Sequence, residues 1–297
     1  MPILAKLVAL IELTRPVEWS KTFGNMVLGS VLALYLTNQP IFTLNNFYLF
    51  LIGFIAAGPL LWGGLYTLND YYDWKKDLLH KVKKTRAIPS GRISANAALL
   101  FSLLLIFLAI FIGGLSGALF FACIAVMFFN QILYTSKPFR LKERAVFDLI
   151  SGSLINPIFR FYAGWVLFAY AFNAPIEVLL FVVGFQFAGF TLYRLSNRKL
   201  ETKLTFRSSN VVFGEKKIRY LAYAVGIIAG LSYLIMCFTI LPPRFLILAV
   251  LSVLAAPLYA KALTKPEEMD MRRMYKLIYA HYTLFIIGFI ILFYVQF

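Results

Sequence analysis

Acidic and amide side chains recur at helical spacing in the segment NDYYDWKKD, residues 69–77. If the helix of the preceding apolar run continues through it, Asn69, Asp73 and Asp77 lie on one face, with Asp70 beside them. Oxygen ligands of this kind suit Mg²⁺, which binds one or two carboxylates and leaves positions for water and substrate phosphates. We interpret the segment as a magnesium and phosphate site. The alternative is that these acids are solvated or satisfy free backbone groups at a helix end.

The stretch HKVKKTRAIPSGRIS, which follows the acids, is basic. Cations beside a carboxylate–Mg²⁺ cluster stabilise the charge that builds on a departing diphosphate. We predict that Lys84 and Arg86 act in catalysis and that Arg92 helps to bind the substrate. Asp73 and Asp77 complete this part of the predicted catalytic set. A general excess of basic residues on one side of a membrane protein explains the cations, but not the acids beside them.

The composition excludes a soluble globular protein. Of 297 residues, 61% are hydrophobic and 14% are charged, and the mean hydropathy is +0.79. An average soluble chain is about one quarter charged, whereas long apolar runs recur here from end to end, as in polytopic α-helical membrane proteins. The net charge of +16 is explained by membrane topology and attraction to anionic lipids. We therefore expect membrane lipids as partners and no nucleic acid.

Nine membrane-spanning helices are predicted, in one domain that occupies residues 1–297. Their approximate ranges are Phe23–Leu36, Phe47–Leu68, Ala97–Gly114, Ala118–Leu133, Val146–Ala169, Ile176–Leu195, Tyr220–Leu241, Phe245–Leu263 and Leu277–Phe297. The first is shorter than the roughly 20 residues that a bilayer requires, so we expect it to begin near Trp19. Pro59 and Pro157 are expected to kink the second and fifth spans.

The basic residues predict the orientation of these spans. Apart from Arg160 and Arg244, the 29 Lys and Arg residues cluster before the first span and around the loops after the second, fourth, sixth and eighth spans. The positive-inside rule then places the N-terminus inside and the C-terminus outside. We expect an integral, multi-pass protein of the plasma membrane. Its active site should face the cytoplasm, because the inner loops hold nearly all the ionisable groups.

Arg160 lies in the middle of the fifth predicted span. A charge at this depth costs several kcal/mol and normally faces a cavity or a partner. We interpret Arg160 as a substrate-binding residue that lines a polar chamber. The alternative is an internal ion pair that only holds helices together.

The first motif resembles that of a known family. NDYYDWKKD followed by KKTRAIPSGRIS is similar to the first aspartate-rich motif of the UbiA superfamily of intramembrane prenyltransferases, N-x-x-x-D-x-x-x-D and then R-P-[LI]-x-x-G-x-I. Its motif positions are filled by Asn69, Asp73, Asp77, Arg86 and Gly91, while an alanine at position 87 replaces the usual proline. The segments TRPVEWSK and YTSKPFRLKER are also family-like, so that the resemblance covers essentially the whole chain.

The resemblance implies nine transmembrane helices around a central chamber open to the cytoplasm. The implied reaction is Mg²⁺-dependent transfer of a prenyl group from an isoprenoid diphosphate donor to a lipophilic acceptor, a small aromatic or polar lipid, in lipid or quinone biosynthesis. Family members place substrate-contacting residues where this chain has Tyr134 and Lys137, which we add to the catalytic set. The alternative is that these two side chains only anchor the helix at the membrane interface.

The family's second motif, D-x-x-x-D, is altered in this chain. If FRSSNVVFG is its downstream landmark, Asn197 and Glu201 stand where the two aspartates belong, and Arg194 and Arg198 add positive charge to nearly the same face. The resemblance thus implies metal ligation by Glu201 together with the first-motif residues Asn69, Asp73 and Asp77. It also implies substrate binding by Asn69, Arg194, Asn197 and Arg198.

Three explanations of the altered motif remain open. The site holds one tightly bound Mg²⁺ and lets Arg or Lys replace the second, or it uses a different phosphorylated substrate, or the protein is a degenerate homologue with low activity. The second explanation has a concrete form in the decaprenyl-phosphate phosphoribosyltransferases, a branch of the same superfamily that also lacks this motif. A transporter would instead carry polar residues through the full membrane depth, whereas here they collect on one side.

Overall fold

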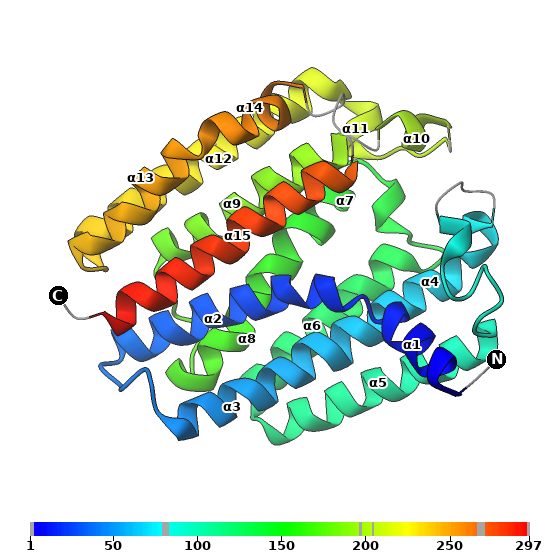
Figure 1. The fold of residues 1–297 in the computed structure, drawn as a ribbon, viewed down its shortest axis with the longest axis horizontal. Helices are drawn as coiled ribbons and strands as arrows, with labels where there is room; N and C mark the ends of the chain where they lie inside the picture. The colour runs from blue at the N-terminus through cyan, green and yellow to red at the C-terminus, as the bar shows by residue number, and fades with distance from the viewer. Residues whose placement is uncertain (1–2, 79–82, 196–197, 204, 266–270, 296–297) are drawn as a thin grey trace. The chain divides into compact units, whose positions relative to one another are not determined.

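The computed structural model describes residues 3–78, 83–195, 198–203, 205–265 and 271–295, and these ranges are built from helices and connecting loops (Figure 1). This confirms the predicted all-α class. Within these described ranges, six helical stretches are long and apolar enough to cross a membrane: Leu44–Asp77, Ala95–Leu115, Ala118–Thr135, Ile176–Leu195, Gly214–Thr239 and Lys276–Tyr294. The chain divides into two compact units. Unit 1 is Met1–Phe139 with Phe159–Phe172, and unit 2 is Arg140–Ile158 with Asn173–Phe297.

Unit 1 contains the helices of the first predicted motif. They are α1 (Ile3–Leu13), α2 (Trp19–Leu36), α3 (Leu44–Ile55), the π-helical segment η2 (Ala56–Trp62), α4 (Gly63–Asp77), α5 (Ala95–Leu115), α6 (Ala118–Thr135) and most of α8 (Asn156–Ala169). Thr43 and Ser94 cap α3 and α5, because their hydroxyl oxygens accept hydrogen bonds from the backbone N–H groups of Asn46 and Ala97. The segments α3, η2 and α4 follow one another without a break.

Both prolines expected to disturb helices occur at π-helical segments. Pro59 lies within η2, and Pro157 is the second residue of α8, directly after the π-helical segment η5 (Ile150–Ile155). Proline has no N–H group to donate, so the regular α-helical hydrogen-bond pattern is interrupted there. The interruption at η2 comes just before α4, the helix that carries the acids.

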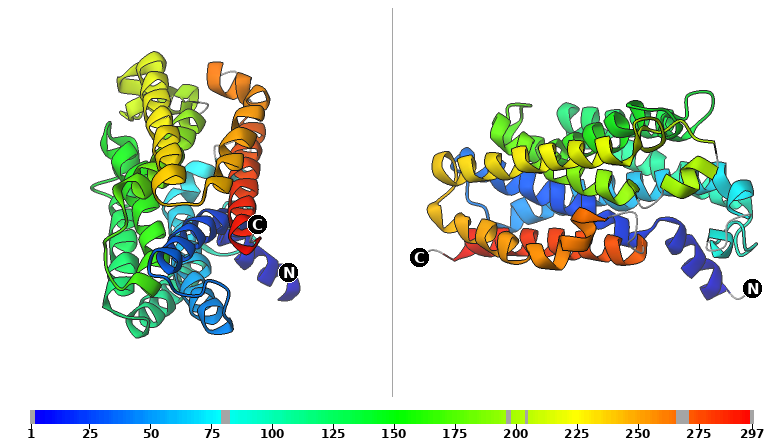
Figure 2. Two further views of the ribbon diagram at one scale, coloured as in Figure 1. Left: turned by 90° about the vertical axis from the view of Figure 1, so that its left-hand side faces the viewer. Right: turned by 90° about the horizontal axis from the view of Figure 1, so that it is seen from above.

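A sharp bend between α1 and α2 brings Arg15 to α4. Arg15 has a left-handed backbone, with φ of 52°, and Pro16 follows it. The indole N–H of Trp19 donates to the carbonyl of Thr14 across the bend, at 2.9 Å. Figure 2 shows α1, in dark blue, leaving α2 at an angle.

Glycines allow two pairs of helices in unit 1 to pack backbone to backbone. A Cβ atom on Gly29 of α2 would lie 2.2 Å from the carbonyl oxygen of Phe161 in α8, and one on Gly164 of α8 would lie 2.1 Å from the carbonyl oxygen of Met26. Between α4 and α5, the Ser102 hydroxyl donates to the carbonyl of Gly64 at 2.9 Å. Close packing at small residues is how helices associate within membranes, and here it fixes α8 and α5 around the helices that bear the site.

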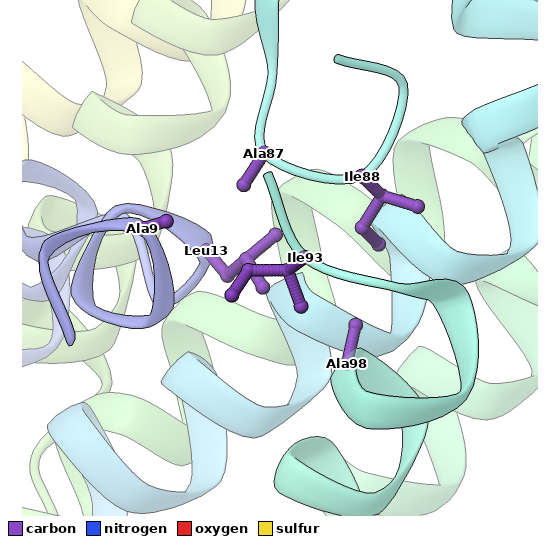
Figure 3. Packing of buried hydrophobic residues seen from close by; sticks show 6 residues of the cluster. All are labelled: Ala9, Leu13, Ala87, Ile88, Ile93 and Ala98. Atoms are coloured by element: carbon purple, nitrogen blue, oxygen red, sulfur yellow. The ribbon is translucent and has the colours of Figure 1, made fainter. Parts of the chain in front are cut away.

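The basic loop after α4 is held by a buried apolar cluster, whose members are Ala9, Leu13, Ala87, Ile88, Ile93 and Ala98 (Figure 3). They come from α1, from the loop and from the first turn of α5, and their side chains converge in Figure 3. The backbone N–H of Ile93 donates to the carbonyl of Ala87 at 3.1 Å, which closes the turn. Gly91 lies within that turn with φ of 73°, a conformation that favours glycine. The loop is therefore a folded structure fixed to two helices.

Unit 2 is also helical. It contains the short turn η4 (Leu141–Glu143), α7 (Phe147–Leu149), η5, α9 (Ile176–Leu195), α10 (Arg198–Lys203), α11 (Ser209–Val212), α12 (Gly214–Thr239), the turn η6 (Pro243–Phe245), α13 (Leu246–Leu254), α14 (Ala256–Thr264) and α15 (Met271–Tyr294). Helices α9 and α12 lie side by side (Figures 1 and 2). Gly184 faces Ala229 at their contact, where an added Cβ atom would be 3.0 Å from the alanine methyl group.

The predicted spans coincide with helices or with consecutive helical segments. The first lies in α2, which begins at Trp19 as expected, and the sixth has the same bounds as α9. The fifth is divided among α7, η5 and α8, and the eighth changes from α13 to α14 at Ala255. The number of membrane crossings and their orientation stay predictions.

Candidate functional site

The acids of the first motif lie on α4, which continues through them to Asp77 as predicted. Asp70 and Asp77 are buried, with 4% and 5% of their surfaces exposed, and Asp73 is half-buried. Asn69 is bonded to α6, because its side-chain oxygen accepts a hydrogen bond from the Thr135 hydroxyl at 3.4 Å. The packed helices thus bring carboxylate and amide oxygens together in a largely buried position.

Arg86 joins two of these acids. Its Nη1 atom lies 3.0 Å from Asp70 Oδ1 and 2.9 Å from Asp77 Oδ2. Seven residues are two helical turns, so both carboxylates lie on one face of α4 and one guanidinium group reaches both. Lys83 adds a weaker contact, with Nζ 3.9 Å from Asp77 Oδ1. The predicted association of the acids with the basic loop is therefore present within unit 1.

Arg15 pairs with the other side of this cluster. Its Nη2 atom donates to Asp70 Oδ1, and its Cζ atom lies 5.3 Å from the centre of the Tyr66 ring. Burial of Arg15 lowers its pKa, but the negative charges of Asp70 and Glu18 outweigh that effect, and the net result is a raised pKa. Asp70 is thus shared by two arginines from distant parts of the chain.

Arg92 and Lys84 are the remaining predicted cations of the loop. Arg92 makes a two-pronged ion pair with Glu12 of α1, at 2.6 and 2.8 Å, and donates to the carbonyl of Thr85 at 2.9 Å. The hydrogen bonds to Glu12 raise the pKa of Arg92. The structure does not bring Arg92 to the acids of α4, and its contacts instead fix the loop to α1. Lys84 is exposed in the short turn η3 (Lys83–Thr85).

Arg160 is buried in α8, with 4% of its surface exposed. Its guanidinium carbon lies 3.8 Å from the centre of the Trp62 ring. The Nε atom of Arg160 and the indole nitrogen of Trp62 are both buried without a hydrogen-bond partner. Buried donors of this kind are rare in native proteins, and each calls for an explanation such as a bound ligand or water. Trp62 is the last residue of η2, and α4, which carries Asp70, follows it directly.

Tyr134 and Lys137 lie at the end of α6 and in the turn that follows it. Tyr134 is half-buried and Lys137 is exposed. The adjacent Thr135 is the residue that contacts Asn69, and Gln131, one turn earlier, donates to the Thr135 hydroxyl at 3.1 Å. This end of α6 is thus next to α4, while the roles of Tyr134 and Lys137 stay predictions.

The second motif lies in unit 2, where Glu201 of α10 is part of a polar network. Glu201 Oε2 accepts a hydrogen bond from the Ser208 hydroxyl at 2.5 Å, and its Oε1 is 3.6 Å from Arg194 Nη2. The same Arg194 nitrogen lies 2.8 Å from Asp148 Oδ2. Arg198 donates from Nε to the carbonyl of Asn210 at 3.1 Å. Asn197 lies outside the residues that the structure describes.

Sequence reasoning placed Asp70 beside the other acids by its helical spacing, but it missed the pairing of Arg15 with Asp70 and it missed Asp148. Asp148 stands at the start of an apolar span and is completely buried. An acid at the end of an apolar run is a usable signal, because such a charge needs a partner. Its partner Arg194 is 46 residues further along the chain, and that pairing was not visible in the sequence.

The chemistry of the first motif fits Mg²⁺. Carboxylate and amide oxygens from Asn69, Asp73 and Asp77 are hard ligands on one helix face, and Mg²⁺ commonly uses one or two carboxylates with water and phosphate oxygens. Among the residues described, no three His, Cys, Asp or Glu side chains are grouped closely enough to enclose a metal by themselves. Mg²⁺ held by these residues would complete its coordination with water or phosphate oxygens.

The fold and its apolar helices define an integral, multi-pass membrane protein of the all-α class. More particularly, the chain belongs to the UbiA prenyltransferase family, whose model matches residues 26–295. This confirms the resemblance drawn from the first motif. The match includes most of unit 1 and nearly all of unit 2.

The chain is similar to several known proteins in structure or in sequence. The fold matches a UbiA homologue from Archaeoglobus fulgidus bound to GPP and Mg²⁺, with a TM-score of 0.73, 18% identity and coverage of 94% of this chain and 96% of that one. It also matches an apo UbiA homologue from Aeropyrum pernix K1, with a TM-score of 0.67, 14% identity and coverage of 93% and 99%.

The digeranylgeranylglyceryl phosphate synthase of Methanobrevibacter smithii is 30% identical over 151 residues, which are 50% of this chain and 50% of that protein. The synthase of the same name from Methanothrix thermoacetophila is 30% identical over 126 residues, 42% of this chain and 45% of that protein. The chain thus matches about half the length of these relatives.

Proposed function

We propose that this protein is a Mg²⁺-dependent prenyltransferase, which transfers a prenyl group from an isoprenoid diphosphate to a polar lipid or a small aromatic acceptor in the membrane. The observation that carries the proposal is the face of α4, where Asn69, Asp73 and Asp77 lie beside Arg86 and Lys83. Family membership and the names of the curated relatives support it. Those names favour a polar lipid acceptor.

Asn69, Asp73 and Asp77 are the residues proposed to hold Mg²⁺. When bound, Mg²⁺ supplies positive charge to the oxygens of a diphosphate. Arg86 balances the charge of Asp70 and Asp77 and would also donate to a diphosphate bound beside them. Lys84 adds charge from the exposed part of the loop. These cations stabilise the pyrophosphate as it departs.

The proposed reaction follows from this arrangement of charge. The bond between the allylic carbon and the diphosphate oxygen breaks, and both electrons leave with pyrophosphate. The allylic cation is then attacked by a nucleophilic atom of the acceptor, which loses a proton. Helices packed around α4 exclude water, which would otherwise capture the cation.

Arg160 is proposed to bind the polar end of a substrate. It is a buried cation whose Nε donor has no hydrogen-bond partner, and its guanidinium group lies on the Trp62 ring. Trp62 lies eight residues before Asp70, which corresponds to about 12 Å along the helix axis. Tyr134 and Lys137 are proposed to contact substrate from the end of α6. Arg92 is better explained as a residue that holds the basic loop in place.

The membrane arrangement is also a proposal. Nine crossings in a single UbiA-like domain, with the N-terminus inside, the C-terminus outside and the site on the cytoplasmic side of the plasma membrane, agree with the distribution of basic residues. The family match spans both units, which supports a single functional domain.

The test of the function is a donor assay with purified protein, Mg²⁺ and membrane lipid extract as acceptor. We expect labelled geranylgeranyl diphosphate, but not labelled phosphoribosyl diphosphate, to give lipid-soluble label. The reverse result would favour the phosphoribosyltransferase alternative, and label from neither donor would indicate a degenerate homologue.

The variant Asp73→Asn tests the proposed metal site in the same donor assay. Because Asp73 is a proposed metal ligand, we expect Mg²⁺-dependent turnover to fall by at least about a hundredfold. Glu177→Gln, in the first turn of α9, is the control and should retain turnover. Full activity of Asp73→Asn would exclude the proposed site.

A further inference from the structure

Arg194, in the last turn of α9, is a cation that bridges Asp148 and Glu201. Its Nη2 atom lies 2.8 Å from Asp148 Oδ2 and 3.6 Å from Glu201 Oε1. The side chains of Arg194 and Glu201 are each 14% exposed, and that of Asp148 is completely buried. Two carboxylates that share one nitrogen at this depth are already neutralised in part by a group of the protein itself.

The carboxylate oxygens of this network are engaged by protein donors. Asp148 Oδ1 accepts from the backbone N–H of Leu149 at 2.9 Å and from the Ser209 hydroxyl, and its Oδ2 accepts from the backbone N–H of Ser209 at 3.0 Å. Glu201 Oε2 accepts from the Ser208 hydroxyl. Mg²⁺ requires nearly ideal octahedral geometry. These oxygens are directed instead at N–H and O–H donors.

Arg194 is also fixed by its helix. The adjacent Leu195 is 1% exposed and packs with Leu192, Leu149, Ile218 and others in a buried cluster. The backbone that carries Arg194 is therefore held in place, and its guanidinium group is held by the contact with buried Asp148. Arg86 differs, because it lies on a loop with 29% of its side chain exposed. It also stands beside a helix face that carries Asp70, Asp73 and Asp77, so displacing it would still leave ligands in place for a metal ion.

We propose that Glu201, the described residue of the second motif, binds no metal ion, and that Arg194, positioned by Asp148, supplies the positive charge beside it in place of a second Mg²⁺. The sequence pattern implied metal ligation by Glu201, and the residues around Glu201 do not fit that role. The inference rests on the proposed function, which assigns Mg²⁺ to α4. It predicts that the protein binds a single Mg²⁺ ion, on α4, and that Arg194 neutralises Asp148 and Glu201 in unit 2.

The test is the number of Mn²⁺ ions bound per chain, measured by electron paramagnetic resonance with inorganic pyrophosphate present. We expect one ion, which is lost in Asp73→Asn and retained in Glu201→Gln. Two ions, one of which is lost in Glu201→Gln, would overturn this inference and leave the proposed function intact. Binding of no ion by the native protein would overturn both.

The variant Arg194→Gln tests directly whether Arg194 keeps a second metal ion from binding. Without the guanidinium group, Asp148 and Glu201 lose their shared counter-charge, so we expect a second Mn²⁺ ion to bind. That ion should be absent from the double variant Arg194→Gln with Glu201→Gln. Arg194→Lys and Arg198→Gln should each keep one ion, and circular dichroism spectra would verify that all variants are folded. A stoichiometry of one in folded Arg194→Gln would contradict the proposed role of Arg194.

Discussion

Arg86 is the residue whose contacts connect the acidic and basic halves of the first motif. It lies 3.0 Å from Asp70 and 2.9 Å from Asp77, and Arg15 shares Asp70 with it. A carboxylate cluster without such counter-charges would be costly to bury. In the proposed reaction Arg86 neutralises the buried acids and also stabilises the departing pyrophosphate. Its removal should therefore strengthen metal binding and lower turnover.

Arg86→Gln is therefore expected to bind Mn²⁺ more tightly in the absence of diphosphate, because Asp70 and Asp77 lose a counter-charge. Turnover should fall by about a hundredfold, because the leaving group loses a cation. Titration with Mn²⁺ and a prenyl-transfer assay measure the two effects. Lys75→Gln removes an exposed cation from α4 and is the control for overall charge. Weaker Mn²⁺ binding in Arg86→Gln would show that Arg86 does not compete with the metal.

At the scale of elements, the contact between α2 and α8 positions Arg160. Gly29 and Gly164 lie at this contact, and the Ser30 hydroxyl donates to the carbonyl of Gly164 at 3.0 Å. Arg160 begins the turn of α8 that packs there, and its guanidinium group lies on Trp62. The close contact of α2 and α8 thus places the buried Arg160 against Trp62, the residue that directly precedes α4.

Gly29→Ala tests this contact. The new methyl carbon would lie 2.2 Å from the carbonyl oxygen of Phe161, so α2 and α8 must separate. We expect the free energy of unfolding to fall by about 2 kcal/mol, seen as a lower thermal midpoint in detergent. Gly114→Ala on α5 is the matched control, because nothing lies within 4 Å of the added carbon, and alanine favours a helix over glycine by up to about 1 kcal/mol. Equal midpoints for the two variants would contradict close packing at Gly29.

For the whole molecule, charge and hydropathy divide the chain into apolar helices and basic loops. Lys84 lies in a basic loop after α4, and Gln39 lies in a loop between α2 and α3 with no basic residue. The positive-inside rule predicts that these loops are on opposite sides of the membrane. That prediction is independent of the catalytic proposals and can be tested in intact cells.

The test replaces the two buried cysteines, Cys123 and Cys237, by alanine and introduces single cysteines at Gln39 or Lys84, which are both exposed. A membrane-impermeant maleimide should label Gln39→Cys in intact cells and Lys84→Cys only after permeabilisation. Labelling of Lys84→Cys in intact cells would reverse the proposed orientation.

The sequence by itself determined the class of fold, the approximate positions of its apolar helices and the first motif. Hydrophobic periodicity and helical spacing are local properties, so the bounds of α9 and the shared face of Asp73 and Asp77 were readable from the chain. The family pattern around Asn69 was equally local, because every position in it is close in sequence.

Only the tertiary structure decided which charges meet. Arg15 and Asp70 are 55 residues apart, and Asp148 and Ser209 are 61 apart. Their pairing depends on how helices pack, which a local pattern does not encode. Burial is the physical reason that it matters: in the low-dielectric interior a carboxylate must find a partner. For Asp70 and Asp77 that partner includes Arg86 on a loop, and for Asp148 it includes Arg194 on a packed helix. We therefore expect the acids of α4 to bind a metal ion and Glu201 to bind none.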